Sequence, residues 1–544
     1  MLLTGGCKAS LHTGVKHPRH KAGWLQPIPP DPEMESHARY ADGVLSEMKG
    51  DIEGAMDAFQ RAVALAPADE DLMLDVTQRF LQYRHPERAL GMLTNAVARP
   101  GASGQLYARL GLVYGQLGRP DLAAAANQTA IRKAPTLLSA HQGLCLNYLQ
   151  LKQEDEALKV LDRAAEVPQA DAEFLLGIAE MYSNVGLLAT PQRTNVPGRI
   201  RALLERAASL QPTNVQTRLK LADGFNQFGD PSRAADLYRS SIEHLEQNTA
   251  LRNAVRSKLA DIYLRTHQRA QAAEQLEALT RDDPMNAQAH FVLGSLALEE
   301  QHPDRAADCF QRAILANPRL EPAYYELASA HLASGRIAEA LAVLDKARAR
   351  FQQTFWGEYL AGVAHARQQD YRQALQHYTA AEVIARAGDT NRLTAGFYFQ
   401  LGVACERSGD IETAVRHFEK CLELSPGFHE AQNYLGYMWA ERGTNLHRAL
   451  DLIERAVKAQ PTNSAYLDSL GWVLFKLGRP REALVQMQRA LEHQDEPDAT
   501  LYEHLGDIHA ALGHFEQARE AWQKALAIQP SDTLRNKLAA PSPP

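Results

Sequence analysis

The sequence predicts an all-α protein in which one helical hairpin is repeated many times along the chain. Residues 110–135 read LGLVYGQLGRPDLAAAANQTAIRKAP, and residues 505–530 read LGDIHAALGHFEQAREAWQKALAIQP. Both segments begin with Leu-Gly, carry Ala 13 and 20 residues after that Leu, and end at Pro. The composition is 45% hydrophobic and only 7% aromatic, and runs of the strand-forming residues Val, Ile and Thr are scarce. These observations indicate helix throughout the repeated region.

Alignment on these landmarks divides the chain into fourteen units, most of them 34 residues long. Small residues occupy positions 8, 20 and 27 of a unit, bulky residues occupy positions 7, 11 and 24, and Pro occupies position 32. The units start near residues 36, 70, 104, 138, 172, 215, 253, 287, 321, 355, 395, 429, 464 and 499. The pattern over residues 36–532 resembles the tetratricopeptide repeat (TPR), in which each unit is a helix, a turn and a second helix. The resemblance implies a TPR solenoid, an elongated right-handed superhelix of about 14 repeats.

The unit that starts at residue 287 shows why these positions are small or bulky. Gly294 and Ala306 allow two antiparallel helices to approach closely, while Leu293 and Phe310 fill the space beside them. Pro318 prevents the second helix from continuing. Many units also carry Gly between the two helices, where a left-handed backbone costs Gly little. These turn residues are Gly50, Gly118, Gly229, Gly335, Gly409, Gly443, Gly478 and Gly513.

Residues 1–35 precede the repeats and are predicted to form a lipoprotein-signal-like start and a flexible linker. The opening MLLTGGCKAS resembles a bacterial lipoprotein signal, in which Cys7 becomes the acylated first residue of the mature protein. Thr4 stands where such signals usually carry Leu, and only three residues precede it, against about 7 to 15 apolar residues in a complete signal. A start codon upstream of Met1 would explain the short segment. The alternative is an incidental Gly-Gly-Cys in a cytoplasmic protein.

Several insertions interrupt the 34-residue period. Residues 187–198, LLATPQRTNVPG, contain two Pro and one Gly and are predicted to form an enlarged loop between two helices. Residues 249–252 and 389–394 lengthen two connections between units, and one residue is added before Ala449. These insertions are either tolerated surface loops or contact loops that bend the array. After the last unit, residues 531–544 are predicted to form a capping helix and a tail, because the ends of a repeat array need polar caps.

Composition excludes several classes of function. A net charge of −7 and an isoelectric point near 6.3 give no basic surface of the kind that binds nucleic acid. No run approaches the roughly 18 to 20 apolar residues of a transmembrane helix, so any membrane attachment is expected through an acylated Cys7. Cys145, Cys309, Cys405 and Cys421 are predicted to be buried or partly buried helix residues without a disulfide framework.

Catalytic, cofactor and metal motifs are not apparent. The chain has no phosphate-binding Gly-rich loop, no His-Glu-x-x-His pair and no Cys-x-x-Cys. His504, His509 and His514 are five residues apart and so do not share a helix face, and the segment HTGVKHPRH from residue 12 to residue 20 is interpreted as linker. We therefore expect no catalytic residues, no metal site and no cofactor.

The repeats predict a non-catalytic scaffold for protein partners. Residues 433–493 resemble the C-terminal portion of long bacterial TPR proteins, many of them in the cell envelope, which implies a role there in assembly, secretion or polysaccharide export. The alternative is a cytoplasmic TPR adaptor or co-chaperone. A carboxylate clamp of the chaperone-binding kind needs Lys at position 5 and Asn at position 9, and no unit has that pair. An enzyme with a site grafted on the groove is the least favoured reading.

The partner is expected to bind in the concave groove. In TPR arrays, positions 2, 5, 9 and 12 of the first helix line this groove, and in six consecutive units they carry aromatic residues. The predicted groove residues are Phe291, Tyr325, Trp356, Tyr359, Phe399, Tyr437, Trp472 and Phe475. The units at 104 and 138 carry no aromatic residue at these positions. Tyr359, Tyr437, Trp472 and Phe475 are predicted as anchors for an extended or helical peptide, unless neighbouring helices cover the rings.

Overall fold

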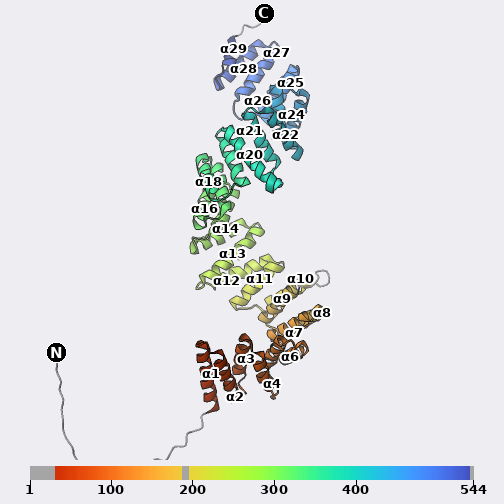
Figure 1. The fold of residues 1–544 in the computed structure, drawn as a ribbon. Helices are drawn as coiled ribbons and strands as arrows, with labels where there is room; N and C mark the ends of the chain where they lie inside the picture. Colours follow the sequence, from red (N-terminus) through yellow and green to blue (C-terminus); the bar gives the residue numbers. More distant parts are fainter. Residues whose placement is uncertain (1–30, 187–194, 540–544) are drawn as a thin grey trace, which may run out of the picture. The chain divides into compact units, whose positions relative to one another are not determined.

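The computed structural model describes residues 31–186 and 195–539, and these residues form 29 α-helices, one short 3-10 helix and no β-strand (Figure 1). The chain divides into two compact units, Met1–Val255 and Arg256–Pro544. Within each unit, consecutive helices pack as pairs in the order in which they occur along the chain. The all-α class and the helix–turn–helix repeats expected from the sequence are therefore confirmed.

The first unit contains six helix pairs, and neighbouring pairs contact one another along the chain. The pairs are α1 (Pro32–Met48) with α2 (Ile52–Leu65), α3 (Glu70–Gln82) with α4 (Pro86–Val97), α5 (Gly104–Gln116) with α6 (Pro120–Lys133), α7 (Leu138–Gln150) with α8 (Glu154–Ala165), α9 (Ala172–Gly186) with α10 (Val196–Ser209), and α11 (Val215–Phe228) with α12 (Pro231–Ile242). The helix α13 (Thr249–Arg265) begins in this unit and continues into the second.

The second unit continues with α14 (Arg269–Asp282) and then seven further pairs. These are α15 (Ala287–Glu299) with α16 (Pro303–Ala316), α17 (Glu321–Ala333) with α18 (Ile337–Arg350), α19 (Phe355–Arg367) with α20 (Tyr371–Gly388), α21 (Ala395–Arg407) with α22 (Ile411–Leu424), α23 (His429–Glu441) with α24 (Leu446–Ala459), α25 (Ser464–Lys476) with α26 (Pro480–Glu492), and α27 (Ala499–Ala511) with α28 (Phe515–Ile528). The 3-10 helix η1 (Thr390–Arg392) lies between α20 and α21, and α29 (Asp532–Ala539) packs on α28.

Two first helices begin four residues before the expected start of their unit. Helix α1 begins at Pro32 because the Asp31 side chain accepts a hydrogen bond from the Glu33 amide at 3.1 Å and Pro is favoured at the first helical position. Helix α13 begins at Thr249, and the Asn248 side chain accepts a hydrogen bond from the Leu251 amide at 3.0 Å. Residues 249–252 are therefore the first turn of a helix, and the prediction of a lengthened connection there was wrong.

The predicted loop 187–198 is shorter at its C-terminal end. Asn195 caps α10 by accepting a hydrogen bond from the Gly198 amide at 3.2 Å, so residues 196–198 are helical although they contain Pro and Gly. Pro is compatible with a first helical turn because its missing N–H has no partner there anyway. Residues 187–194 lie outside the described part of the chain. The other predicted connection, 389–394, contains the short helix η1.

A close contact between a glycine at position 8 and a large side chain at position 24 sets the spacing of six helix pairs. A Cβ atom built on Gly294 would lie 2.6 Å from Cε1 of Phe310, which is fully buried on the facing helix. No side chain larger than a hydrogen atom fits there without movement of the helices. The same contact joins Gly43 to Phe59, Gly362 to Tyr378, Gly402 to Phe418, Gly471 to Met487 and Gly506 to Trp522. In the unit with the extra residue before Ala449, Gly436 faces Ile453 instead.

The turn between paired helices requires a left-handed backbone. All eight turn glycines named from the sequence have positive φ, for example 73° at Gly335. Units without Gly adopt the same conformation with φ between 58° and 63°, at Arg84, Lys152, His267, Gln301 and Gln369. A non-Gly residue pays about 1 to 2 kcal/mol for this conformation. The packing of the two helices therefore imposes the turn, whichever residue occupies it.

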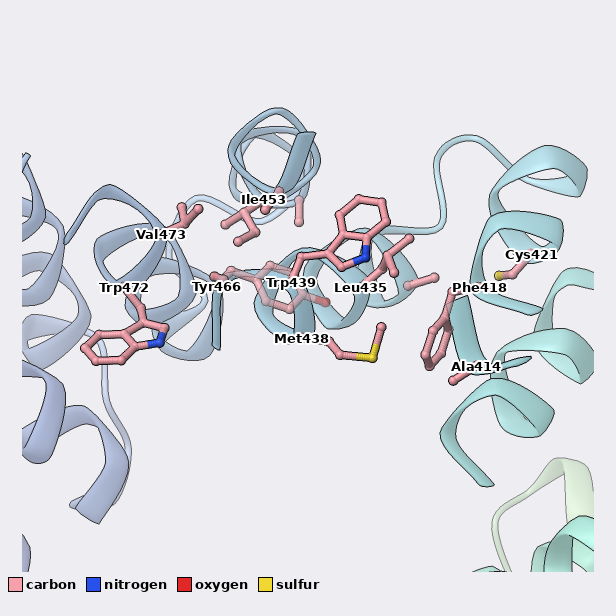
Figure 2. Close-up of a cluster of buried hydrophobic side chains, with 14 of the residues drawn as sticks. Ala414, Phe418, Cys421, Leu435, Met438, Trp439, Ile453, Tyr466, Trp472 and Val473 are labelled. Carbon is pink, nitrogen blue, oxygen red and sulfur yellow. The ribbon is translucent and has the colours of Figure 1, made fainter. Parts of the chain in front are cut away.

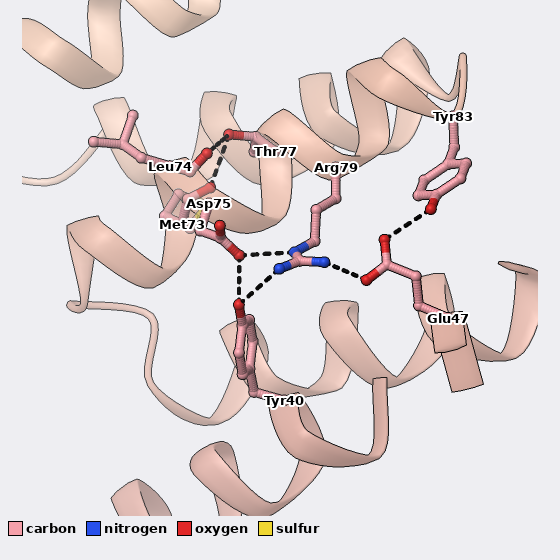
Figure 3. A network of polar contacts seen from close by, with 8 residues as sticks. All are labelled: Tyr40, Glu47, Met73, Leu74, Asp75, Thr77, Arg79 and Tyr83. Atoms are coloured by element: carbon pink, nitrogen blue, oxygen red, sulfur yellow. Dashed lines mark hydrogen bonds and ion pairs between the residues drawn. The ribbon is translucent and has the colours of Figure 1, made fainter. Parts of the chain in front are cut away.

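First helices of neighbouring pairs also contact one another, and between α1 and α3 this contact is polar (Figure 3). The guanidinium of Arg79 donates to Asp75 at 2.9 Å and to the hydroxyl of Tyr40 at 3.1 Å, and it also pairs with Glu47. Tyr40 donates to Asp75 and Tyr83 donates to Glu47, both at 2.8 Å. The predicted groove face is thus charged and hydrogen-bonded at the N-terminal end of the first unit.

One pair departs from the rule of a large apolar side chain at position 24. Asn127 of α6 takes that place and is 1% exposed. Its amide lies against both Gly111 of α5 and Gly143 of α7, where an added Cβ would come within 2.5 and 2.8 Å. Neither Oδ1 nor Nδ2 of Asn127 has a hydrogen-bond partner among the described residues. A buried amide without partners destabilises its surroundings by about 1 to 3 kcal/mol.

The last helix, α29, covers the end of the second unit. Leu534 is 2% exposed, and the ammonium of Lys537 donates to Glu503 at 2.8 Å and to Asp507 at 2.7 Å, both on α27. Burial of Leu534 removes apolar surface from water, and the ion pairs leave the outer face polar.

The substitution Gly294→Ala is expected to destabilise α15 and α16. The added methyl group would overlap Phe310, and overpacking of this kind costs about 1 to 3 kcal/mol, more than the gain of about 1 kcal/mol from the better helix former. Hydrogen–deuterium exchange of peptides from α15 and α16 should accelerate. Gly91→Ala in α4 is the control, because nothing lies within 4 Å of its Cβ, and it should slow exchange in its own pair. Equal effects of the two substitutions would contradict the spacing contact.

Candidate functional site

The eight predicted groove aromatics differ in how far they are covered. All eight lie on first helices of the second unit, between α15 and α25. Trp356 alone among them is exposed, with 48% of its surface accessible, whereas Trp472 is 6% exposed. The remaining six are partly buried.

Trp472 is held inside a polar and aromatic cluster, and it belongs to the buried cluster drawn in Figure 2. Its indole Nε1 donates to Glu441 on α23 at 2.8 Å, and its ring stacks on His504 of α27 with centroids 3.9 Å apart. His504 in turn is hydrogen-bonded to Asp468 at 2.9 Å, and the ammonium of Lys476 lies 4.6 Å from the indole centroid. Side chains from both neighbouring repeats therefore cover Trp472, which leaves little of the ring for a partner.

The other covered rings pack against aromatic neighbours in the same way. Each of them has a ring centroid between 5.2 and 6.1 Å from another aromatic ring. These rings belong to Phe291, Tyr359, Phe399, Tyr437 and Phe475.

Trp356 and Tyr325 line a cavity of about 460 Å³ on the surface formed by α17 and α19. Leu360 and Pro322 add apolar walls, and Ser329 and Thr354 add hydroxyl groups. The charged groups at the cavity are Glu321, Glu326 and Arg392. A concave site of this size with apolar walls and a few polar groups is typical of ligand recognition.

Tyr325 is fixed in one orientation at the wall of this cavity. Its hydroxyl donates to Glu321 at 2.8 Å and accepts from the Thr354 hydroxyl at 2.8 Å. Thr354 also caps α19 by accepting from the Gly357 amide at 3.2 Å. A Cβ on Gly357 would lie 3.3 Å from the Tyr325 ring, so the ring rests directly on the α19 backbone. Burial raises the pKa of Tyr325 to about 12, so the hydroxyl stays neutral even in moderately alkaline solution.

Trp356 lines the same cavity as Tyr325 and packs against two aromatic rings of its own helix. Its ring packs edge-on against Phe355, at 5.2 Å and 76°, and against Tyr359, at 6.0 Å and 77°. Phe355 is 3% exposed and belongs to the core of the second unit. The Trp356 ring is therefore anchored by Phe355 and Tyr359, while about half of its surface stays exposed.

Sequence reasoning missed the polar residues of this site. Thr354 and Arg392 lie in connections between units, outside positions 2, 5, 9 and 12. Glu326 occupies position 6, where the neighbouring units carry the apolar residues Val292 and Leu360. A carboxylate at a position that is apolar in the adjacent repeats could have identified Glu326 as a site residue from the sequence.

The described residues hold no group of three or more His, Cys, Asp or Glu side chains placed to bind a metal ion. Cys145, Cys405 and Cys421 are buried, and burial raises the pKa of each thiol to about 11, so these side chains are protonated at neutral pH. His509 and His514 contact each other at 3.3 Å, whereas His504 stacks on Trp472. Cys7 and the histidines of residues 12–20 lie outside the described ranges. No helix within those ranges has the length and hydropathy to cross a membrane.

The fold and this site define a helical-repeat protein with a cavity on the surface of its first helices α17 and α19. Sequence models of the family described as tetratricopeptide repeat match residues 78–137, 257–322, 399–464 and 469–533, and two further models of the same description match residues 353–426 and 297–364. The chain belongs to the tetratricopeptide repeat family. Arrays of this kind present extended binding surfaces for other proteins.

Individual relatives resemble parts of the chain. The TPR repeat-containing protein PA4667 of Pseudomonas aeruginosa is 30% identical over 219 residues, which are 40% of this chain and 36% of that protein. The protein CTR9 homolog of Arabidopsis thaliana is 26% identical over 387 residues, 68% of this chain and 33% of the relative. The chain therefore spans about a third of the length of these relatives. A chain in the crystal structure of the APC/C hetero-tetramer Cut9-Hcn1 is 15% identical to this chain and aligns with a TM-score of 0.38. The alignment covers 94% of this chain and 98% of the Cut9-Hcn1 chain.

The substitutions Trp472→Ala and Trp356→Ala are expected to affect stability very differently. Loss of the buried indole at position 472 removes its stacking and its hydrogen bond to Glu441 and should cost about 3 to 5 kcal/mol. Loss of the half-exposed indole at position 356 should cost about 1 kcal/mol or less. Urea unfolding followed by circular dichroism measures both. Equal losses would mean that Trp356 serves packing as much as Trp472 does.

Proposed function

We propose that this protein is a non-catalytic scaffold that binds a segment of a protein partner in the cavity between α17 and α19. The observation that carries this proposal is Trp356, which keeps 48% of its surface exposed at the wall of a cavity of about 460 Å³. Exposed Trp and Tyr side chains in a concave site dominate protein interfaces because they bury much apolar area with little loss of side-chain entropy.

The supporting residues make this site ready to bind without rearrangement. Tyr325 is held by Glu321 and Thr354, and Trp356 rests on Phe355. Side chains that are already ordered in the free protein lose little entropy on binding, so more of the contact energy appears as affinity. An extended segment suits the surface, since it can follow the first helices from one repeat to the next.

The double substitution Trp356→Ala with Leu360→Ala should release partners of the intact protein. Both side chains line the cavity, and removal of hot-spot contacts costs about 2 kcal/mol or more, roughly thirtyfold in affinity. Proteins that co-purify with tagged wild type from cells of the source organism should be depleted from the variant in quantitative mass spectrometry. Leu315→Ala on α16 is the control, since Leu315 is an exposed apolar residue outside this cavity. Full retention of every partner by the folded variant would reject this site.

We also propose that the protein acts at the bacterial cell envelope, in assembly, secretion or polysaccharide export, rather than as a cytoplasmic adaptor or co-chaperone. The support is the Gly-Gly-Cys at residues 5–7 with its polar continuation. Acyl chains attached to Cys7 would anchor the protein, because two or more chains bind a membrane stably whereas one binds marginally.

Expression from the complete reading frame should place the protein in the membrane fraction. Cys7→Ser, or treatment of the cells with globomycin, should move it to the soluble fraction and remove the added mass of the acyl groups. Fractionation and intact-mass spectrometry measure these outcomes. A wild-type protein without acyl mass, distributed like Cys7→Ser, would favour the cytoplasmic adaptor.

A further inference from the structure

We propose that the cavity between α17 and α19 receives a basic side chain, arginine or lysine, of the bound segment. This inference rests on the proposed function and names the chemistry of the partner. It follows from the two carboxylates that line the cavity and from the exposed ring of Trp356 beside them. It also follows from the ion pair that neutralises Arg392, the cation that lines the cavity.

Glu326 is a carboxylate that a bound cation would stabilise. It lines the cavity from α17 and is partly buried. Among the described residues, Glu326 makes no hydrogen bond and no ion pair, in contrast to Glu358 on the next first helix, which is paired with both Arg348 and His377. Burial raises the pKa of the Glu326 carboxyl, and no nearby charge opposes that shift. A carboxylate in this situation gains free energy when a ligand brings a positive charge.

Glu321 adds a second negative charge at the same cavity. One of its oxygens accepts the hydrogen bond from Tyr325, and no ion pair within residues 31–186 and 195–539 neutralises it. Two carboxylates on successive turns of α17 therefore border the space in front of Trp356. An acidic partner segment would be repelled here, and an apolar side chain would leave both charges without compensation.

Arg392 lines the cavity but is engaged elsewhere. Its Nε lies 3.3 Å from the Asp389 carboxylate, and its guanidinium lies 5.8 Å from the centre of the Phe355 ring. The residues described include no ion pair between Arg392 and either glutamate of the cavity. The positive charge of Arg392 is thus balanced by Asp389, and the cavity keeps its negative character.

Trp356 supplies the other half of a site for a cation. A guanidinium or ammonium group over an indole face is attracted by the electrons of the ring, and Trp is the strongest of the aromatic side chains in this respect. The aliphatic part of an arginine or lysine side chain would lie against Leu360 and Trp356, as long basic side chains do on apolar surfaces. The charged end would then reach Glu326, and the bond between them would be charge-assisted.

Fluorine NMR of the full chain labelled with 5-fluorotryptophan tests this assignment, with the Trp356 signal identified by Trp356→Phe. The probes are the blocked amino acids N-acetyl-arginine methylamide, N-acetyl-lysine methylamide, N-acetyl-norleucine methylamide and N-acetyl-glutamate methylamide. The arginine and lysine probes should shift the Trp356 signal saturably, and the norleucine and glutamate probes should not. Glu326→Gln should lower the affinity for the arginine probe by about tenfold, which is the effect of losing one hydrogen bond to a charged group.

Glu339→Gln on α18 is the matched control, because Glu339 is exposed and does not line the cavity, and it should bind like wild type. Glu326→Gln should stay folded, since it replaces a half-buried charge by a neutral group of the same shape. An equal response to norleucine, or an unchanged affinity in Glu326→Gln, would overturn the proposal. Free methylguanidinium that binds as well as the blocked arginine would assign the cavity to small cations and so contradict a peptide ligand.

The failure of this inference is distinguishable from failure of the proposed function. Loss of partners in the Trp356→Ala, Leu360→Ala variant together with no response to the arginine probe would keep the scaffold and remove its basic ligand. Retention of all partners together with saturable arginine binding would keep the cation site and remove its role in partner capture.

Discussion

The contact of a glycine with a large side chain at the centre of seven hairpins is the constraint on which the other features depend. Because Gly294 lets the Phe310 ring reach the backbone of α15, the alanine Ala306 on α16 becomes fully buried. The same spacing, repeated in successive units, brings first helices side by side. Tyr325 can therefore rest on Gly357 of the following repeat and bond to Thr354, which lies just before that repeat. The cavity is a product of the repeat spacing as much as of its own residues.

Much of the fold was predictable because the signals are local to one hairpin. Small residues, turn glycines and closing prolines act within about 34 residues, and a helix pair forms its main contacts within the same span. The early starts of α1 and α13 were not predicted, since each depends on a capping side chain, Asp31 or Asn248, that lies before the first aligned position of its repeat. A cap of this kind is a single residue, and an alignment on the 34-residue period does not detect it.

The candidate site was predictable only in part, because exposure of a side chain depends on the neighbouring repeats. Trp472 and Trp356 both occupy positions that line a TPR groove, yet Trp472 is covered by Glu441 and His504 from the repeats on either side. Trp356 has no such cover and keeps an open face. Aligning one repeat with the next does not reveal this difference in exposure. The residues that cover Trp472 lie 31 and 32 positions away from it in the sequence.

The buried amide of Asn127 has a consequence for how the array opens. Repeat proteins unfold in cooperative blocks whose boundaries lie where coupling between neighbouring repeats is weakest. Asn127 lies between two first helices, α5 and α7, and replaces the large apolar side chain that couples the hairpin in other units. An opening here exposes a polar group that gains hydrogen bonds to water, which lowers the free energy of the opened state. The Asn127 amide therefore makes opening at α5, α6 and α7 easier than it would be with an apolar side chain of the same size.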